Sequence, residues 1–111
     1  MIIWDSKKGK SKKVLKGHSE SVTSISIFAE EDSSTPLLIS TGIDKLIIIW
    51  AINLEDISKT NVLRKLTGHT DRVCHLDVYI PTKNSKHPAL IVSGSDDRTL
   101  RGKLYILFKN K

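Results

Sequence analysis

The chain has 111 residues, 39% hydrophobic and 27% charged, which suits one small globular domain and excludes a disordered chain. Its net charge of +6 is mildly attractive to acidic partners, and the single cysteine, Cys74, excludes an internal disulfide and favours a reducing compartment. No apolar run approaches the roughly 18 residues that span a membrane, and the N-terminus does not resemble a secretory signal. We therefore expect a soluble protein of the cytoplasm, with the nucleus as the alternative.

The first residues read as the end of a strand followed by a basic loop. Ile2-Ile3-Trp4-Asp5 matches Ile48-Ile49-Trp50 further along the chain. Ser6–Lys13 is rich in lysine and contains a glycine, so we expect a loop there. Lys13–Lys16, which carries two aliphatic residues, is a candidate short strand.

Two later segments alternate between apolar and polar residues, as a half-buried strand does. The first is Ser21–Phe28, in which the alternation slips by one residue between Val22 and Ile25. The second is Arg72–Tyr79, which repeats the same pattern and the same slip. The slip predicts a β-bulge near the start of each strand.

A buried hairpin is the most strongly predicted element. Pro36–Thr41 and Leu46–Trp50 are apolar runs rich in Ile and Leu, and they flank a short turn that contains Gly42. Glycine at such a turn often serves a positive φ angle, and we expect the same of Gly94.

The rest of the chain continues the pattern of short strands and polar turns. Val62–Leu66 and Ala89–Ser93 read as strands, and Thr99–Phe108 reads as a last extended run. The remaining segments are expected loops or turns: Ala29–Thr35, Asn53–Thr60, Pro81–Pro88 and Gly94–Arg98. With no convincing helical period, the predicted fold class is all-β.

Polar residues repeat with the strands. A histidine precedes each alternating strand. A serine lies 22 or 24 residues after that histidine, and an aspartate lies four residues after the serine. The first set also has a tryptophan. The two sets are His18, Ser40, Asp44 and Trp50, and His69, Ser93 and Asp97. Internal repeats of this kind indicate a repeat architecture.

These residues resemble the WD-repeat β-propeller family. Gly17-His18, Ser40-Thr41-Gly42-Ile43-Asp44 and Ile49-Trp50 fit the family's unit once, and Gly68-His69 with residues 93–101 fits it again. The resemblance implies an incomplete propeller of about two blades of antiparallel strands plus an N-terminal remnant. The expected divisions are the tail of a preceding repeat (1–16), one repeat (17–66), a partial repeat (67–101) and a divergent tail (102–111).

Two features depart from the family pattern. After Arg101 the family places an aliphatic residue and tryptophan, whereas this chain has Gly102-Lys103, so Lys103 takes the place of the tryptophan. A closed propeller also needs typically 4–8 blades. We therefore expect this chain to be a fragment, completed by further WD repeats or by self-association.

The histidine, serine and aspartate could be interpreted as a hydrolytic triad. A triad needs an exposed nucleophile and an oxyanion site, and Ser40 inside a buried strand offers neither. The family resemblance implies instead that the set is a structural hydrogen-bond network. In a buried site such a network fixes one geometry, because buried polar groups must be paired. We expect the second network, which lacks its tryptophan, to be the weaker one.

No cofactor or metal site is predicted. Cys74 and His75 are adjacent on a strand and point to opposite faces, so they cannot chelate one ion together. Gly42 and Gly94 belong to no phosphate-binding loop, because no Gly-Lys-Ser/Thr sequence follows them.

The resemblance implies a non-catalytic scaffold for protein–protein interaction. By position in the family's unit, the partner-binding candidates are Ser21, Thr23, Ile43, Lys45, Arg72, Cys74, Asp96 and Arg98. An alternative is binding to nucleic acid or another anionic surface through the basic run Lys7–Lys16, although no aromatic residues interleave with it.

Overall fold

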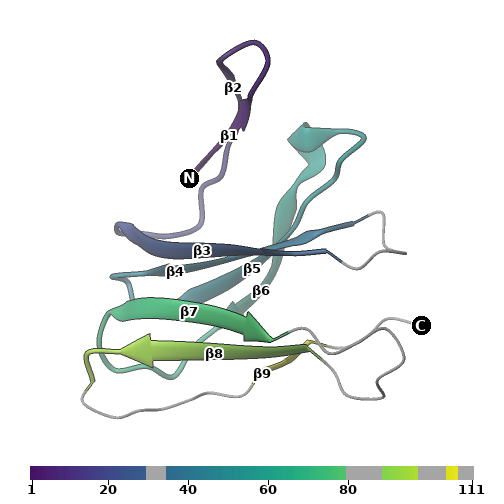
Figure 1. Cartoon of the computed structure of the whole chain (residues 1–111). Coiled ribbons are helices and arrows are strands. Elements are labelled where there is room, and N and C mark those ends of the chain that lie inside the picture. Colours follow the sequence, from purple (N-terminus) through teal and green to yellow (C-terminus); the bar gives the residue numbers. More distant parts are fainter. Residues whose placement is uncertain (30–34, 80–88, 98–104, 108–111) are drawn as a thin grey trace.

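The structure is a computed structural model that describes residues 1–29, 35–79, 89–97 and 105–107 (Figure 1). The described residues form three antiparallel sheets and no α-helix, which confirms the predicted all-β class. The first sheet pairs β1 (Ile2–Asp5) with β2 (Lys10–Val14). The middle sheet has β3 (Val22–Phe28), β4 (Leu37–Gly42), β5 (Ile47–Ala51) and β6 (Asn61–Leu66) in that order. The last sheet has β7 (Val73–Tyr79), β8 (Ala89–Ser95) and β9 (Tyr105–Leu107).

The hairpin β4–β5 is the centre of the fold, as predicted. Its strands pair antiparallel with Ile39 opposite Ile49, and both side chains are buried. β-Branched and aliphatic residues favour this position because they pack well on a pleated surface that is covered on both sides.

The predicted bulges are present in both copies of the alternating strand. The pairing of β3 with β4 shifts between Val22 and Ser24, and the pairing of β7 with β8 shifts between Val73 and His75. The bulge therefore resets the alternation at the same place in each sheet.

The two central strands of the middle sheet, β4 and β5, are covered on both faces. Its leading face, defined here by Leu38, Ser40, Ile48 and Trp50, packs against the first sheet through Leu15, Met1 and Ile3. Its trailing face, defined by Ile39, Ile47 and Ile49, packs against the leading face of the last sheet, where Val73, Leu76, Val78 and Ile91 lie. The middle and last sheets are stacked on each other, whereas the β1–β2 hairpin projects from the other strands and contacts the middle sheet at its open end (Figure 1). The faces are named in chain order, so each sheet has a leading and a trailing face.

Four local predictions need correction. Lys10–Lys13 belongs to β2 and not to a loop, because it pairs with β1; Leu15, expected in a strand, lies beyond β2 and is buried. The expected polar loop Asn53–Thr60 contains a 3-10 helix, η1 (Ile57–Lys59), whose N-terminus is capped by the Asp56 side chain. Strand β8 continues to Ser95, into the segment predicted as a turn.

Of the expected last run, Thr99–Phe108, only Tyr105–Leu107 is described, and it forms β9. Residues 30–34, 80–88, 98–104 and 108–111 lie outside the described part of the chain, and with them most of the predicted loops Ala29–Thr35 and Pro81–Pro88.

Candidate functional site

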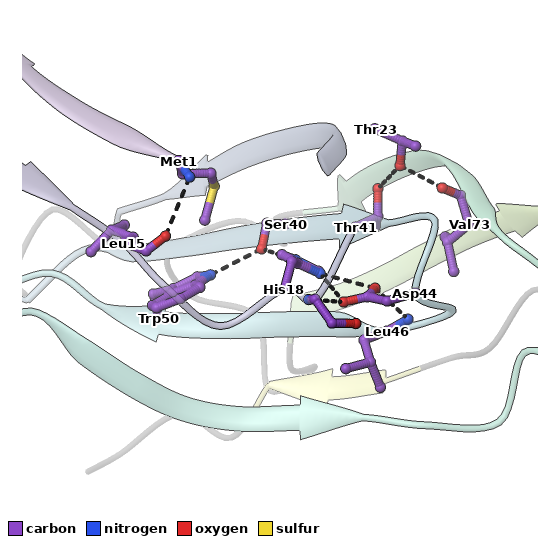
Figure 2. Close-up of polar contacts among 11 residues, drawn as sticks. Met1, Leu15, His18, Thr23, Ser40, Thr41, Asp44, Leu46, Trp50 and Val73 are labelled. Carbon is purple, nitrogen blue, oxygen red and sulfur yellow. Dashed lines mark hydrogen bonds and ion pairs between the residues drawn. The ribbon is translucent and has the colours of Figure 1, made fainter. Parts of the chain in front are cut away.

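A four-residue network connects the leading face of the middle sheet to the β4–β5 turn (Figure 2). His18, in the segment before β3, lies with Nε2 2.7 Å from Ser40 Oγ and Nδ1 2.9 Å from Asp44 Oδ2. The indole N–H of Trp50 donates to Ser40 Oγ at 2.9 Å. The Asp44 carboxylate also accepts backbone N–H groups of Ser19 and Leu46. The network therefore joins the segment before β3 to β4, β5 and their turn.

One tautomer of neutral His18 satisfies the whole network. With the proton on Nδ1, the ring donates to Asp44 and leaves Nε2 to accept from the Ser40 hydroxyl. Ser40 then donates to His18 and accepts from Trp50. Proton donors and acceptors alternate along the chain of four groups, so none of them is left unpaired.

The burial of the network decides what chemistry it can do. Ser40 is 0% exposed and Trp50 2%, and the side chains of His18 and Asp44 are 4% and 3% exposed. No buried side-chain nitrogen or oxygen of the described residues lacks a hydrogen-bond partner. A serine hydroxyl that is buried and hydrogen-bonded to two neighbouring side chains is not placed to attack a substrate. The geometry is that of a structural brace.

Two glycines let the backbone approach this network closely. A Cβ atom at Gly42 would lie 2.7 Å from both His18 Nδ1 and Asp44 Oδ1, and one at Gly17 would lie 2.6 Å from the Trp50 ring. The expected positive φ at Gly42 and Gly94 is wrong, since neither has one; in the β4–β5 turn it is Lys45 that has φ 69°. Gly42 is needed for space and not for its backbone angle.

The last sheet holds a second network of the same geometry. His69 Nε2 lies 2.7 Å from Ser93 Oγ, and Nδ1 lies 3.0 Å from Asp97 Oδ2. The side chains of His69 and Asp97 are each 2% exposed. Among the described side chains, the Ser93 hydroxyl has no donor in the role that Trp50 has in the middle sheet.

The register of β9 changes the expectation about the missing tryptophan. In the middle sheet, Trp50 lies opposite Leu38, which is two residues before Ser40. In the last sheet, the residue two before Ser93 is Ile91, and Tyr105 lies opposite it. Lys103, expected at this place from residue counting, lies outside the described part. Tyr105 follows Ser93 by 105 − 93 = 12 residues, whereas Trp50 follows Ser40 by 50 − 40 = 10, so counting along the chain gives the wrong residue.

The partner-binding candidates lie at one edge of the middle and last sheets. In the middle sheet this edge holds the start of β3 and the β4–β5 turn, and in the last sheet it holds the start of β7 and the residues at the end of β8. Ile43 N donates to Ser21 O in the middle sheet, and Asp96 N donates to Arg72 O in the last sheet. We call these residues the strand-start edge; all of its described members except Cys74 are exposed. The described members are Ser21, Thr23, Ile43, Lys45, Arg72, Cys74 and Asp96, while Arg98 lies outside the described residues.

Charged groups on this edge interact with one another. The Arg72 guanidinium donates to Asp96, and its hydrogen bond and charge, with a weaker bond from the Cys74 thiol, lower the pKa of that carboxyl. Partial burial raises the pKa of the Cys74 thiol, and the hydrogen bond to Asp96 raises it further. The thiol is therefore protonated at neutral pH and is a poor nucleophile.

One contact on this edge was not foreseen from the sequence. The Thr23 hydroxyl contacts the Thr41 hydroxyl and donates to the backbone carbonyl of Val73, so it connects the middle and last sheets (Figure 2). A threonine in an alternating strand does not by itself predict a contact with another sheet. Within the described ranges, no group of three or more His, Cys, Asp or Glu side chains is placed to hold a metal ion.

A comparison with protein-family models found a match that covers most of the chain. The model described as "WD domain, G-beta repeat" matches residues 9–51 and 60–101. Comparisons with curated proteins and with solved structures returned no match.

Proposed function

The chain belongs to the WD-repeat family, and we propose that it is a non-catalytic scaffold that binds other proteins through its strand-start edge. WD repeats are in general protein-interaction modules. The observation that carries the proposal is the pair of buried His–Ser–Asp networks, whose polar groups hold the fold together and leave none free for a reaction.

The composition of the edge suits a peptide or protein surface. It combines the exposed aliphatic side chain of Ile43 with the opposite charges of Arg72 and Asp96 and several hydroxyl groups. Arginine and aliphatic side chains beside hydrogen-bonding groups are a common mixture at protein interfaces. The main chain beneath them is fixed by the backbone bonds from the turns, so little ordering is needed on binding.

Affinity capture with matched variants tests this proposal. Ile43→Lys and Arg72→Glu alter the edge, whereas Leu63→Lys alters an exposed aliphatic residue on β6, away from it. We expect proteins captured by the unaltered chain to be lost with the first two variants and retained with the third. A captured set that is the same for all three variants would contradict the proposed edge.

A second candidate function is binding to an anionic surface, with nucleic acid as one case. The β1–β2 hairpin projects from the other strands (Figure 1), and all lysines of the basic run except Lys13 are exposed. Lys13 donates to the Ser58 carbonyl, and Lys12 lies 3.9 Å from Asp5. The free lysines would make a salt-dependent contact.

This candidate predicts a steep loss of binding to heparin or polyphosphate as salt rises. Replacing Lys7, Lys8 and Lys10 by Gln should weaken the binding and flatten its salt dependence, because fewer counterions are released. Replacing Lys59 and Lys65, which lie outside the run, is the control. Equal losses for the two sets would show a net-charge effect and not a site.

A further inference from the structure

The stack of sheets exposes apolar side chains at both of its ends. On the leading face of the middle sheet, Ile25 and Ile27 are 58% and 63% exposed, because the first sheet has no strands opposite β3. On the trailing face of the last sheet, Tyr79 and Val92 are 61% and 43% exposed. Ile25 and Ile27 lie opposite the buried Ser40 and Leu38. Tyr79 lies opposite the half-buried Leu90, and Val92 lies opposite the exposed Asp77.

These two surfaces correspond to the two sides of an interface that the chain already contains. Leu76 and Val78 hold in β7 the places of Ile25 and Ile27 in β3, and they pack on the trailing face of the middle sheet. On that trailing face, Ile39 directly precedes Ser40, as Val92 directly precedes Ser93. The two open ends therefore present the strand positions of the two opposite sides of one interface, and neither end presents both sides.

The polar groups at the two ends are also complementary. The first sheet repeats β5–β6, including a register shift directly before its tryptophan, between Ile3 and Trp4 as between Ile49 and Trp50. Trp4 is 60% exposed and has no described hydrogen-bond partner. Ser93 is the serine of a network that has its histidine and aspartate but no described tryptophan donor.

We propose that copies of this chain associate head to tail and complete one another's sheets. β1 of a second copy pairs with β8, so that β7, β8, β1 and β2 form one four-stranded composite sheet. By the register of the middle sheet, Trp4 then lies opposite Ile91 and donates its indole N–H to Ser93 Oγ. Tyr79 and Val92 of the first copy cover Ile25 and Ile27 of the second. This association goes beyond the proposed scaffold function and does not depend on the strand-start edge.

The association requires β9 to leave β8, because Tyr105 occupies the place opposite Ile91. β9 is paired through only three residues, Tyr105 to Leu107, at one end of β8. β1 is longer than β9, contains Trp4 and is already paired with β2. It therefore makes more contacts with β8 than β9 does and can replace it.

Three matched lysine variants of the full chain test the head-to-tail geometry by light scattering and native mass spectrometry. Ile27→Lys blocks one end, Val92→Lys blocks the other, and Leu63→Lys on β6 is the control. We expect the unaltered chain and the control to show a mass that rises with concentration. Each blocked variant alone should stay monomeric, while their equimolar mixture should form a 1:1 dimer through the two ends that remain intact.

Two further variants test the composite sheet itself. Trp4→Phe should weaken association by about tenfold, the equivalent of one hydrogen bond. Ile106→Pro, which prevents β9 from pairing with Leu90, should strengthen it. Circular dichroism of each variant checks that it is folded. Three results would overturn the proposal: an unaltered chain that is monomeric, self-association of either blocked variant, or a mixture that stays monomeric. Weaker association of Ile106→Pro would exclude displacement of β9.

Discussion

The middle and last sheets contain the same His–Ser–Asp set with nearly the same distances, but only the middle sheet has a tryptophan bonded to its serine. The middle sheet is also the one whose central strands are covered on both faces. The histidine, serine and aspartate are therefore sufficient to hold a strand to its turn. The tryptophan adds the next strand to that unit, and it also fills space against Gly17.

The largest expected difference between the sheets is at their turn glycines. Gly42→Ala would place a methyl group 2.7 Å from His18 and Asp44, so we expect it to lower the free energy of unfolding by about 2–3 kcal/mol. At Gly94 the nearest atom to an added Cβ is 3.7 Å away, an ordinary contact. Gly94→Ala should therefore change stability by less than about 1 kcal/mol. Urea denaturation of both variants measures the difference, and equal losses would contradict the close approach at Gly42.

Removal of the serine hydroxyls should have the next largest effect. Ser40→Ala leaves both His18 Nε2 and the Trp50 indole without a partner, whereas Ser93→Ala leaves only His69 Nε2 among the described groups. A buried unpaired group costs about 1–3 kcal/mol, so Ser40→Ala should be the more destabilising by at least about 1 kcal/mol. Thermal melting of the two variants compares them. A larger loss for Ser93→Ala would contradict the expectation that the second network is the weaker one.

The tryptophans provide a smaller contrast. Trp50→Phe keeps most of the ring but removes the donor to Ser40, and we expect a loss of about 0.5–1.5 kcal/mol plus the effect of the smaller ring. Trp4→Phe, at an exposed site, should change the stability of the monomer by less than about 0.5 kcal/mol. Both are measured by denaturation in dilute solution, where association is negligible. A loss at position 4 as large as at position 50 would show a contact of Trp4 within the monomer.

The smallest expected effect concerns reactivity at the strand-start edge. Asp96→Asn removes a negative charge and a strong acceptor beside Cys74, so the pKa of the thiol should fall towards its ordinary value. The alkylation rate of Cys74 at pH 8 should then rise, with little change in melting temperature. Leu63→Lys, far from the thiol, is the control, and an unchanged rate in Asp96→Asn would contradict the hydrogen bond.

The same cluster has a defined dependence on pH. Because the pKa of Asp96 is lowered in the folded chain, its interaction with Arg72 is complete at neutral pH and is lost as the pH falls through that lowered pKa. The groups are exposed, so added salt should weaken the effect as well.

The all-β class, the hairpin β4–β5, the bulges in β3 and β7, and the family could all be predicted from the sequence. These features depend on local alternation, on β-branched runs and on a repeated spacing, all of which are visible along the chain. Three other features became visible only in the folded chain: Gly42 is needed for space, Tyr105 and not Lys103 lies opposite Ile91, and Thr23 connects two sheets. The tertiary structure also decided which apolar residues stay exposed. Ile25 and Leu76 occupy the same place in their strands, and only the presence or absence of a neighbouring sheet distinguishes them. Such differences arise from contacts between segments far apart in the chain, and a local pattern does not contain them.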